Sequence, residues 1–200
     1  MDGVLIDAKE WHYESLNKSL MLFGLSISRY DHLVTYDGLP TKKKLEILTE
    51  ERGFPEKLHN FVNIMKQIYT MELVHTKCKP CFHHEYALSK LKCDGYRLAV
   101  ASNSIKETVR AMLEKAELIK YLDFFFSNED VKMAKPDPEI YTKAISYLGF
   151  SPKEVLIIED NEHGIEAARR SGAFVMEVRT VEEVNYYNII NTIRRIEKGS

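Results

Sequence analysis

The sequence predicts an α/β protein whose parallel-sheet core carries a helical insertion near its start. Residues 9–77 show helical spacing and no run typical of a buried strand. The rest of the chain alternates short apolar runs with helical segments, which is typical of a doubly wound, Rossmann-like parallel sheet. We therefore expect residues 1–8 and 78–200 to form the α/β core, and residues 9–77 to form a separate helical domain.

The helical part is predicted from spacing and from helix-breaking residues. Tyr13, Leu16 and Leu20 recur at helical intervals, and Gly24 is a typical helix stop. After the break at residues 38–40, Thr41 is expected to cap the next helix. The core is predicted from strands at residues 98–101, 124–126, 155–158 and 174–178, with helices at 107–116, 138–148 and 164–171.

Composition excludes several classes of protein. Hydrophobic residues make up 44% and charged residues 29% of the 200, which is ordinary for a globular protein. The net charge of −2 gives no reason to expect nucleic acid as a partner. No apolar run reaches membrane-spanning length, no signal peptide opens the chain, and three cysteines do not make a disulfide framework. We expect a cytoplasmic protein without an obligate protein partner.

Polar residues follow the first of the core runs, where open α/β sheets bind ligands. Ser102, Asn103 and Ser104 come directly after residues 98–101. A hydroxyl group and backbone N–H groups at this position suit a phosphate oxygen. The alternative is that these residues only cap the next helix.

Two further groups stand at comparable positions. Lys135 lies in a loop with two prolines, where it would neutralise a phosphoryl group or remain a surface lysine. Glu159 and Asp160 end the run at residues 155–158, and adjacent carboxylates there suit Mg²⁺. The alternative for the last pair is helix capping by Asp160 or Asn161.

In this order, these groups resemble the motifs of the haloacid dehalogenase superfamily. The opening Asp2-Gly3-Val4-Leu5-Ile6-Asp7 is similar to the end of that superfamily's first motif, and the resemblance covers essentially the whole chain. The insertion resembles a type-1 helical cap, and Trp11-His12 resembles an aromatic-histidine pair of related sequences. The subgroup indicated is that of β-phosphoglucomutase and phosphoglycolate phosphatase.

The resemblance implies a mechanism through an aspartyl-phosphate. Asp2 would protonate the leaving oxygen and then activate water, and its carbonyl group would touch Mg²⁺. Ser102 and Lys135 would hold the phosphoryl oxygens with support from Asn103. Asp160 would bind Mg²⁺ directly, and Glu159 directly or through water. His12 would contact the substrate or serve the cap as a hinge, or it is an ordinary packed histidine.

The resemblance also places the nucleophilic Asp one residue before Met1, together with the central strand of the sheet. We therefore expect the printed chain to be inactive, with two unpaired strand edges and an empty slot in the core. Truncation, a misplaced start or a family member without the nucleophile would each explain why the nucleophile and the strand are missing.

The functional prediction is an Mg²⁺-dependent phosphatase acting on a small phosphate ester, such as a sugar or polyol phosphate. The alternatives are a phosphomutase and a non-catalytic phosphate-binding protein; a receiver-type signalling domain is weaker because it needs no such insertion. Lys43, within Lys42-Lys43-Lys44, is predicted to contact an anionic substrate, although a solvated helix face is the simpler interpretation. Cys78, Cys81, His83 and His84 suggest zinc, but no second cluster follows, so we disfavour that interpretation.

Overall fold

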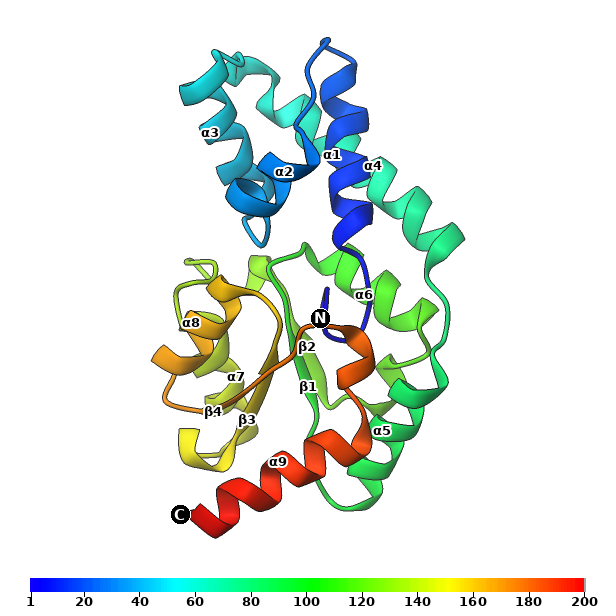
Figure 1. Ribbon diagram of the computed structural model, residues 1–200, viewed down its shortest axis with the longest axis vertical. Helices are drawn as coiled ribbons and strands as arrows, with labels where there is room; N and C mark the ends of the chain where they lie inside the picture. Colours follow the sequence, from blue (N-terminus) through cyan, green and yellow to red (C-terminus); the bar gives the residue numbers. More distant parts are fainter. Residues whose placement is uncertain (200) are drawn as a thin grey trace. The chain divides into compact units, whose positions relative to one another are not determined.

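The computed structural model describes residues 1–199, and the chain divides into two compact units. One unit joins Met1–Asp7 to the chain from Cys78 onward, and the other is Ala8–Lys77 (Figure 1). None of the helices that the structure describes combines the length and the apolar character needed to cross a membrane.

The helical unit is built around α1 and α4, which pack along one another. Its core includes Leu16 and Leu20 of α1, as the helical spacing predicts, together with Leu45 and Leu48 of α3. Thr41 is not a cap, because α3 begins at this residue and Pro40 precedes it as the N-cap. The elements of the unit are α1 (Lys9–Met21), α2 (Arg29–Asp31), η1 (His32–Tyr36), α3 (Thr41–Arg52), η2 (Glu56–Leu58) and α4 (His59–Lys77).

The other unit alternates strands with helices, so the predicted α/β class is confirmed. Its helices are α5 (Phe82–Cys93), α6 (Lys106–Lys115), α7 (Glu139–Leu148), α8 (Glu162–Arg170) and α9 (Tyr186–Gly199). Its strands are β1 (Ala99–Ala101), β2 (Phe124–Phe126), β3 (Leu156–Glu159) and β4 (Phe174–Glu177). Short 3₁₀ turns complete it: η3 (Ile119–Tyr121), η4 (Asn128–Asp130), η5 (Pro152–Glu154) and η6 (Val181–Glu183).

The four strands form two separate parallel pairs. Ala99 of β1 lies opposite Phe124 of β2, and Leu156 of β3 lies opposite Phe174 of β4. Within residues 1–199 no ladder joins β1 to β3. The strands are therefore parallel, as expected, but the described part of the chain does not close them into one sheet.

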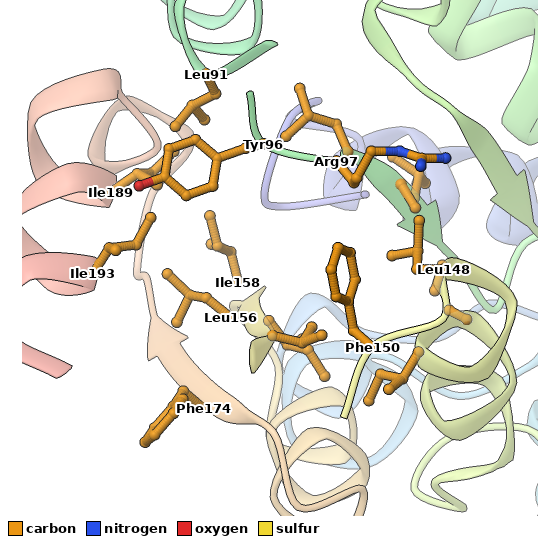
Figure 2. A pocket seen from close by; sticks show the side chains of 18 of the residues that line it. Leu91, Tyr96, Arg97, Leu148, Phe150, Leu156, Ile158, Phe174, Ile189 and Ile193 are labelled. Atoms are coloured by element: carbon orange, nitrogen blue, oxygen red, sulfur yellow. The ribbon is translucent and has the colours of Figure 1, made fainter. Parts of the chain in front are cut away.

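A cavity of about 530 Å³ separates the two pairs. It is lined by residues 98–101 on one side and 155–159 on the other, and by Met1 and Val4. Leu156 and Ile158 of β3 point into this space, with Ile189 and Ile193 of α9 along one side of it (Figure 2). Strand edges thus border a largely apolar cavity.

Candidate active site

The loop after β1 contacts the N-terminal segment through a hydrogen bond. The Ser104 hydroxyl donates a hydrogen bond to Oδ2 of Asp2 at 3.0 Å, and the Ser104 N–H donates to the Ser102 hydroxyl at 3.1 Å. Ser102 is buried. The helix-capping alternative for these serines is wrong, because α6 begins at Lys106 and its N-cap is Ile105. The Ser104 hydroxyl is therefore held against Asp2, and the Ser102 hydroxyl is fixed by the Ser104 backbone at the carboxyl end of β1.

Asn103 fixes the backbone of a second loop. Its Oδ1 accepts a hydrogen bond from the Lys135 N–H at 3.1 Å, and its Nδ2 donates to the Lys135 carbonyl at 3.5 Å. These two bonds hold residue 135 against the end of β1. Asn103 is thus in a position to support Lys135, as the resemblance implies, through hydrogen bonds to its backbone.

The Lys135 side chain is buried, so the surface-lysine alternative is wrong. Its ammonium group donates to the Ala101 carbonyl at 3.1 Å and to the Tyr141 hydroxyl at 2.7 Å. It also pairs with Oε1 of Glu159 at 2.5 Å. A buried charge is tolerated when it is paired and hydrogen-bonded, and these three contacts meet that condition.

Glu159 is held as firmly as the lysine. Tyr141 donates to Oε1, and the Asp160 N–H donates to Oε2 at 3.3 Å. A Cβ atom on Gly164 would lie 2.3 Å from the Glu159 carboxyl carbon, so this position requires glycine if the carboxylate is to stay in place. Burial alone would raise the pKa of the Glu159 carboxyl, but Lys135 and the Met1 amino group outweigh it and lower that pKa. Glu159 is therefore an ionised partner of Lys135.

Asp160 is the carboxylate that best fits a magnesium ion. Asn161 caps α8, since its Oδ1 accepts from the His163 N–H at 3.0 Å, so helix capping does not fall to Asp160. Mg²⁺ prefers one or two carboxylates together with waters and substrate phosphate. Asp160, directly after β3, could provide such a carboxylate, with the Asp2 backbone carbonyl as a further oxygen donor, whereas Glu159 directs its oxygens to other partners.

The remaining predicted residues, His12 and Lys43, lie in the helical unit. Lys43 is exposed and pairs with Glu46 at 3.4 Å. Its neighbour Lys44 is buried, and its pKa is lowered to about 8, chiefly by burial and then by the charge of Lys66. The Lys66 ammonium group lies 3.5 Å from Nδ1 of His12. A buried group of cationic and imidazole side chains therefore exists here, with Lys44 rather than Lys43 in it.

Sequence reasoning did not single out Tyr141, and among the three lysines at residues 42–44 it chose Lys43, whereas Lys44 is the buried one. Burial raises the pKa of the Tyr141 phenol well above its ordinary value, and the Glu159 charge raises it further. Tyr141 is thus a hydrogen-bond donor to the carboxylate at any ordinary pH. The available signal was its place in the helix that follows Lys135, six residues later.

The fold and the site define a class: an α/β protein with carboxylates and a buried lysine at the carboxyl ends of parallel strands. The haloacid dehalogenase-like hydrolase model matches residues 1–178, and the chain belongs to this family.

The relatives agree with this assignment. The chain is 31% identical over 175 residues to a phosphorylated carbohydrates phosphatase of Thermotoga maritima, covering 86% of this chain and 79% of that protein. It is 31% identical over 173 residues to a phosphoglycolate phosphatase of Aquifex aeolicus, covering 86% and 78%. The crystal structure of a β-phosphoglucomutase from Clostridium difficile superimposes with a TM-score of 0.82 at 20% identity, covering 97% and 94%. Phosphatase relatives support a hydrolase, and the structural neighbour shows the shared fold.

Proposed function

We propose that this protein is an Mg²⁺-dependent phosphatase of a small phosphorylated metabolite, such as a sugar or polyol phosphate. The observation that carries the proposal is the fixed, buried Lys135, which Asn103, Tyr141 and Glu159 hold at the ends of β1 and β3. Such a cation stabilises the charge of a transferring phosphoryl group without reorganising during the reaction.

Each nearby side chain takes a definite role in this proposal. Ser102 and Lys135 bind the phosphoryl oxygens, and Asp2 gives a proton to the leaving oxygen and later takes one from water. The Asp160 carboxylate and the Asp2 backbone carbonyl would hold Mg²⁺, which when bound offsets the charge of the phosphate. We assign Glu159 the role of positioning Lys135, because both Glu159 oxygens already accept hydrogen bonds within the protein.

We propose that the nucleophile belongs to a segment that would fill the cavity. Met1 lines the cavity, and its amino group lies close enough to Glu159 to lower the pKa of that carboxyl. An extended segment leading into Met1 would pass between β1 and β3 and end at the same edge of the sheet. Its last residue would then stand beside Asp2, where an Asp carboxylate would attack phosphorus and form the aspartyl-phosphate.

A test compares three chains: residues 1–200 alone, the same chain preceded by about six apolar residues ending in Asp, and that extended chain ending in Asn. Phosphate release from sugar phosphates is measured with Mg²⁺ and with EDTA. We expect turnover only from the Asp extension with Mg²⁺. Equal melting temperatures of the Asp and Asn extensions, both above that of the unextended chain, would show that both fill the cavity. Turnover by the unextended chain would refute the assigned nucleophile, and stable but inactive Asp extensions would favour a phosphate-binding protein.

A phosphomutase is the second candidate, favoured by the buried Lys44 and Lys66 of the helical unit. Two cationic side chains that partly repel one another suit a substrate with a second anionic group. We assign this unit the role of a lid that selects the substrate. Isomer formation from a sugar phosphate, measured against phosphate release on the Asp-extended chain, separates a mutase from a phosphatase.

A further inference from the structure

Three metal-ligating side chains meet at the start of α5, outside the site described above. One ligand atom from each of Cys81, His83 and His84 lies within 4.8 Å of the others. The Cys81 sulfur lies 3.1 Å from Nδ1 and 3.8 Å from Nε2 of His83. In a tetrahedral zinc site, Zn–S and Zn–N bonds of about 2.3 Å and 2.0 Å place sulfur and nitrogen about 3.6 Å apart. The cluster therefore needs only small side-chain adjustments to hold one ion.

His84 adds an independent observation that points to a ligand. The side chain is 1% exposed, and its Nε2 lies 2.9 Å from the carbonyl oxygen of Val181. A carbonyl oxygen only accepts, so Nε2 carries the hydrogen and Nδ1 keeps a lone pair. Among the described residues, that buried Nδ1 has no hydrogen-bond partner. Zinc-ligating histidines characteristically donate their second ring N–H to a backbone carbonyl or a carboxylate.

Cys78 is a separate thiol, despite its place three residues before Cys81. It is buried, and its sulfur donates to the Met112 carbonyl at 3.6 Å. Burial raises the pKa of the Cys78 thiol to about 11, and its sulfur is directed at the Met112 carbonyl, so Cys81 is the cysteine that we assign to the site. Cys93 lies at the exposed end of α5 and serves as a natural reference cysteine.

The geometry points to a zinc site formed by Cys81, His83 and His84, with a fourth position for water or for the carboxylate of Glu182. Thiolate and imidazole ligands select Zn²⁺ over the hard Mg²⁺ that the aspartates would bind. Cys81 and His83 are partly exposed, which gives an ion access, while His84 anchors the site to η6. Bound zinc would stabilise the junction between the first turn of α5 and the segment that leads into α9.

The test uses the full chain, stripped with EDTA and titrated with Co²⁺ and then with Zn²⁺. Cobalt bound to a thiolate gives a near-ultraviolet charge-transfer band that carboxylate sites do not give. We expect one equivalent of Co²⁺ to develop this band, Zn²⁺ to displace it, and Zn²⁺ to raise the melting temperature. Cys81→Ser should abolish the band, and His83→Asn should weaken affinity by more than about 100-fold, since even outer partners are worth 10–100-fold.

Matched variants make the outcome decisive. Cys93→Ser and His75→Gln remove an exposed cysteine and a histidine of the helical unit, and both should retain the band. Asp160→Asn should retain it as well, because the magnesium site is a different one. A band that survives Cys81→Ser, or that disappears in Cys93→Ser, overturns the assignment. So does the absence of any thiolate band in a folded chain, and neither result affects the proposed phosphatase.

Discussion

The two units of this protein bury lysine side chains in different ways. In the α/β unit, Lys135 is paired with Glu159 at 2.5 Å and bonded to Ala101 and Tyr141. In the helical unit, Lys44 is buried near another lysine, Lys66, with Asp37 as the opposing charge, and its pKa is lowered to about 8. The charge of Lys135 is thus balanced by a carboxylate within the fold, whereas the charge of Lys44 is balanced only in part.

In the function that we propose, the difference corresponds to two roles, which are phosphoryl transfer for Lys135 and substrate selection for Lys44. A cation that must stabilise a transferring phosphoryl group benefits from a rigid, fully paired setting, because no reorganisation is then needed during the reaction. A cation whose surroundings lower its pKa gains from the arrival of an anion, which favours the charged form. We therefore expect changes in the first setting to harm both stability and activity, and changes in the second to harm substrate binding while relieving strain in the free protein.

The largest effect is expected for Lys135→Met, which leaves the buried Glu159 without its cation. Removing one partner of a buried pair costs about 3–5 kcal/mol. Urea unfolding followed by circular dichroism should show this loss, and the Asp-extended chain, which we propose to be active, should lose phosphatase activity.

The matched control is the double variant Lys135→Met with Glu159→Gln, which removes both charges. Its free energy of unfolding should recover most of the loss, while activity stays absent because the phosphoryl group has lost its cation. If the double variant is no more stable than the single one, Glu159 and Lys135 are not coupled, and the first half of the comparison is wrong.

Lys44→Met is expected to act in the opposite direction. A pKa lowered from 10.5 to about 8 corresponds to about 3 kcal/mol of destabilisation while the lysine is charged. The folded-state pKa lies below the unfolded one, so wild-type stability is lowest below pH 8 and rises between pH 8 and pH 10.5. The variant should be more stable than wild type at pH 7, by up to about 3 kcal/mol, and the difference should disappear by pH 10.5.

Lys43→Met provides the control, since Lys43 is the exposed neighbour in the same helix. It should change stability by less than about 0.5 kcal/mol at every pH. In the Asp-extended chain, Lys44→Met should also raise KM for substrates with a second anionic group more than it lowers kcat. A Lys44→Met variant that is less stable than wild type at pH 7 would mean that the fold compensates this lysine after all.

The core could be predicted because its strands are short, continuous apolar runs. The expected strands at residues 98–101 and 155–158 coincide with β1 and β3 to within a residue at either end. Polar residues directly after those runs identify Asn103 and Glu159 by position alone, since parallel strands end at one edge of the sheet. This part of the site follows from local sequence.

The parts that were missed depend on which way a helical side chain faces. Lys42, Lys43 and Lys44 follow one another in the chain at about 100° intervals around the helix, so only packing decides which is buried. The contact of Tyr141 with Glu159 joins residues 18 apart and depends on how α7 lies against β3. No spacing rule within one sequence predicts which of the three lysines is buried or that Tyr141 contacts Glu159. Such a rule does not distinguish Lys43 from Lys44.

Tyr141→Phe is expected to have the smallest effect on stability and activity. It tests how much the Tyr141 hydroxyl contributes to holding Glu159 and Lys135. The substitution removes one hydroxyl that donates to Glu159 but leaves Lys135 in place, so no buried charge is orphaned. A hydrogen bond to a charged group contributes about 1.5–3 kcal/mol, and we expect stability to fall by this amount. In the Asp-extended chain, kcat should fall about tenfold with little change in KM, since that is what 1.4 kcal/mol of lost positioning amounts to.

The pH dependence distinguishes this role from simple packing. Lys135 and Tyr141 hold the folded-state pKa of Glu159 below its unfolded value of about 4.3, so its stabilising contribution exists above that pH and is lost as the pH falls. Without the hydroxyl the folded-state pKa rises, and the stability difference from wild type should be largest near pH 7 and shrink below pH 4. Tyr147→Phe, on the exposed face of the same helix, should leave both stability and its pH profile unchanged. A Tyr141→Phe deficit that is the same at pH 3.5 and pH 7 would assign the tyrosine to packing alone, and the rigid setting of Lys135 would then rest on Glu159 and Asn103.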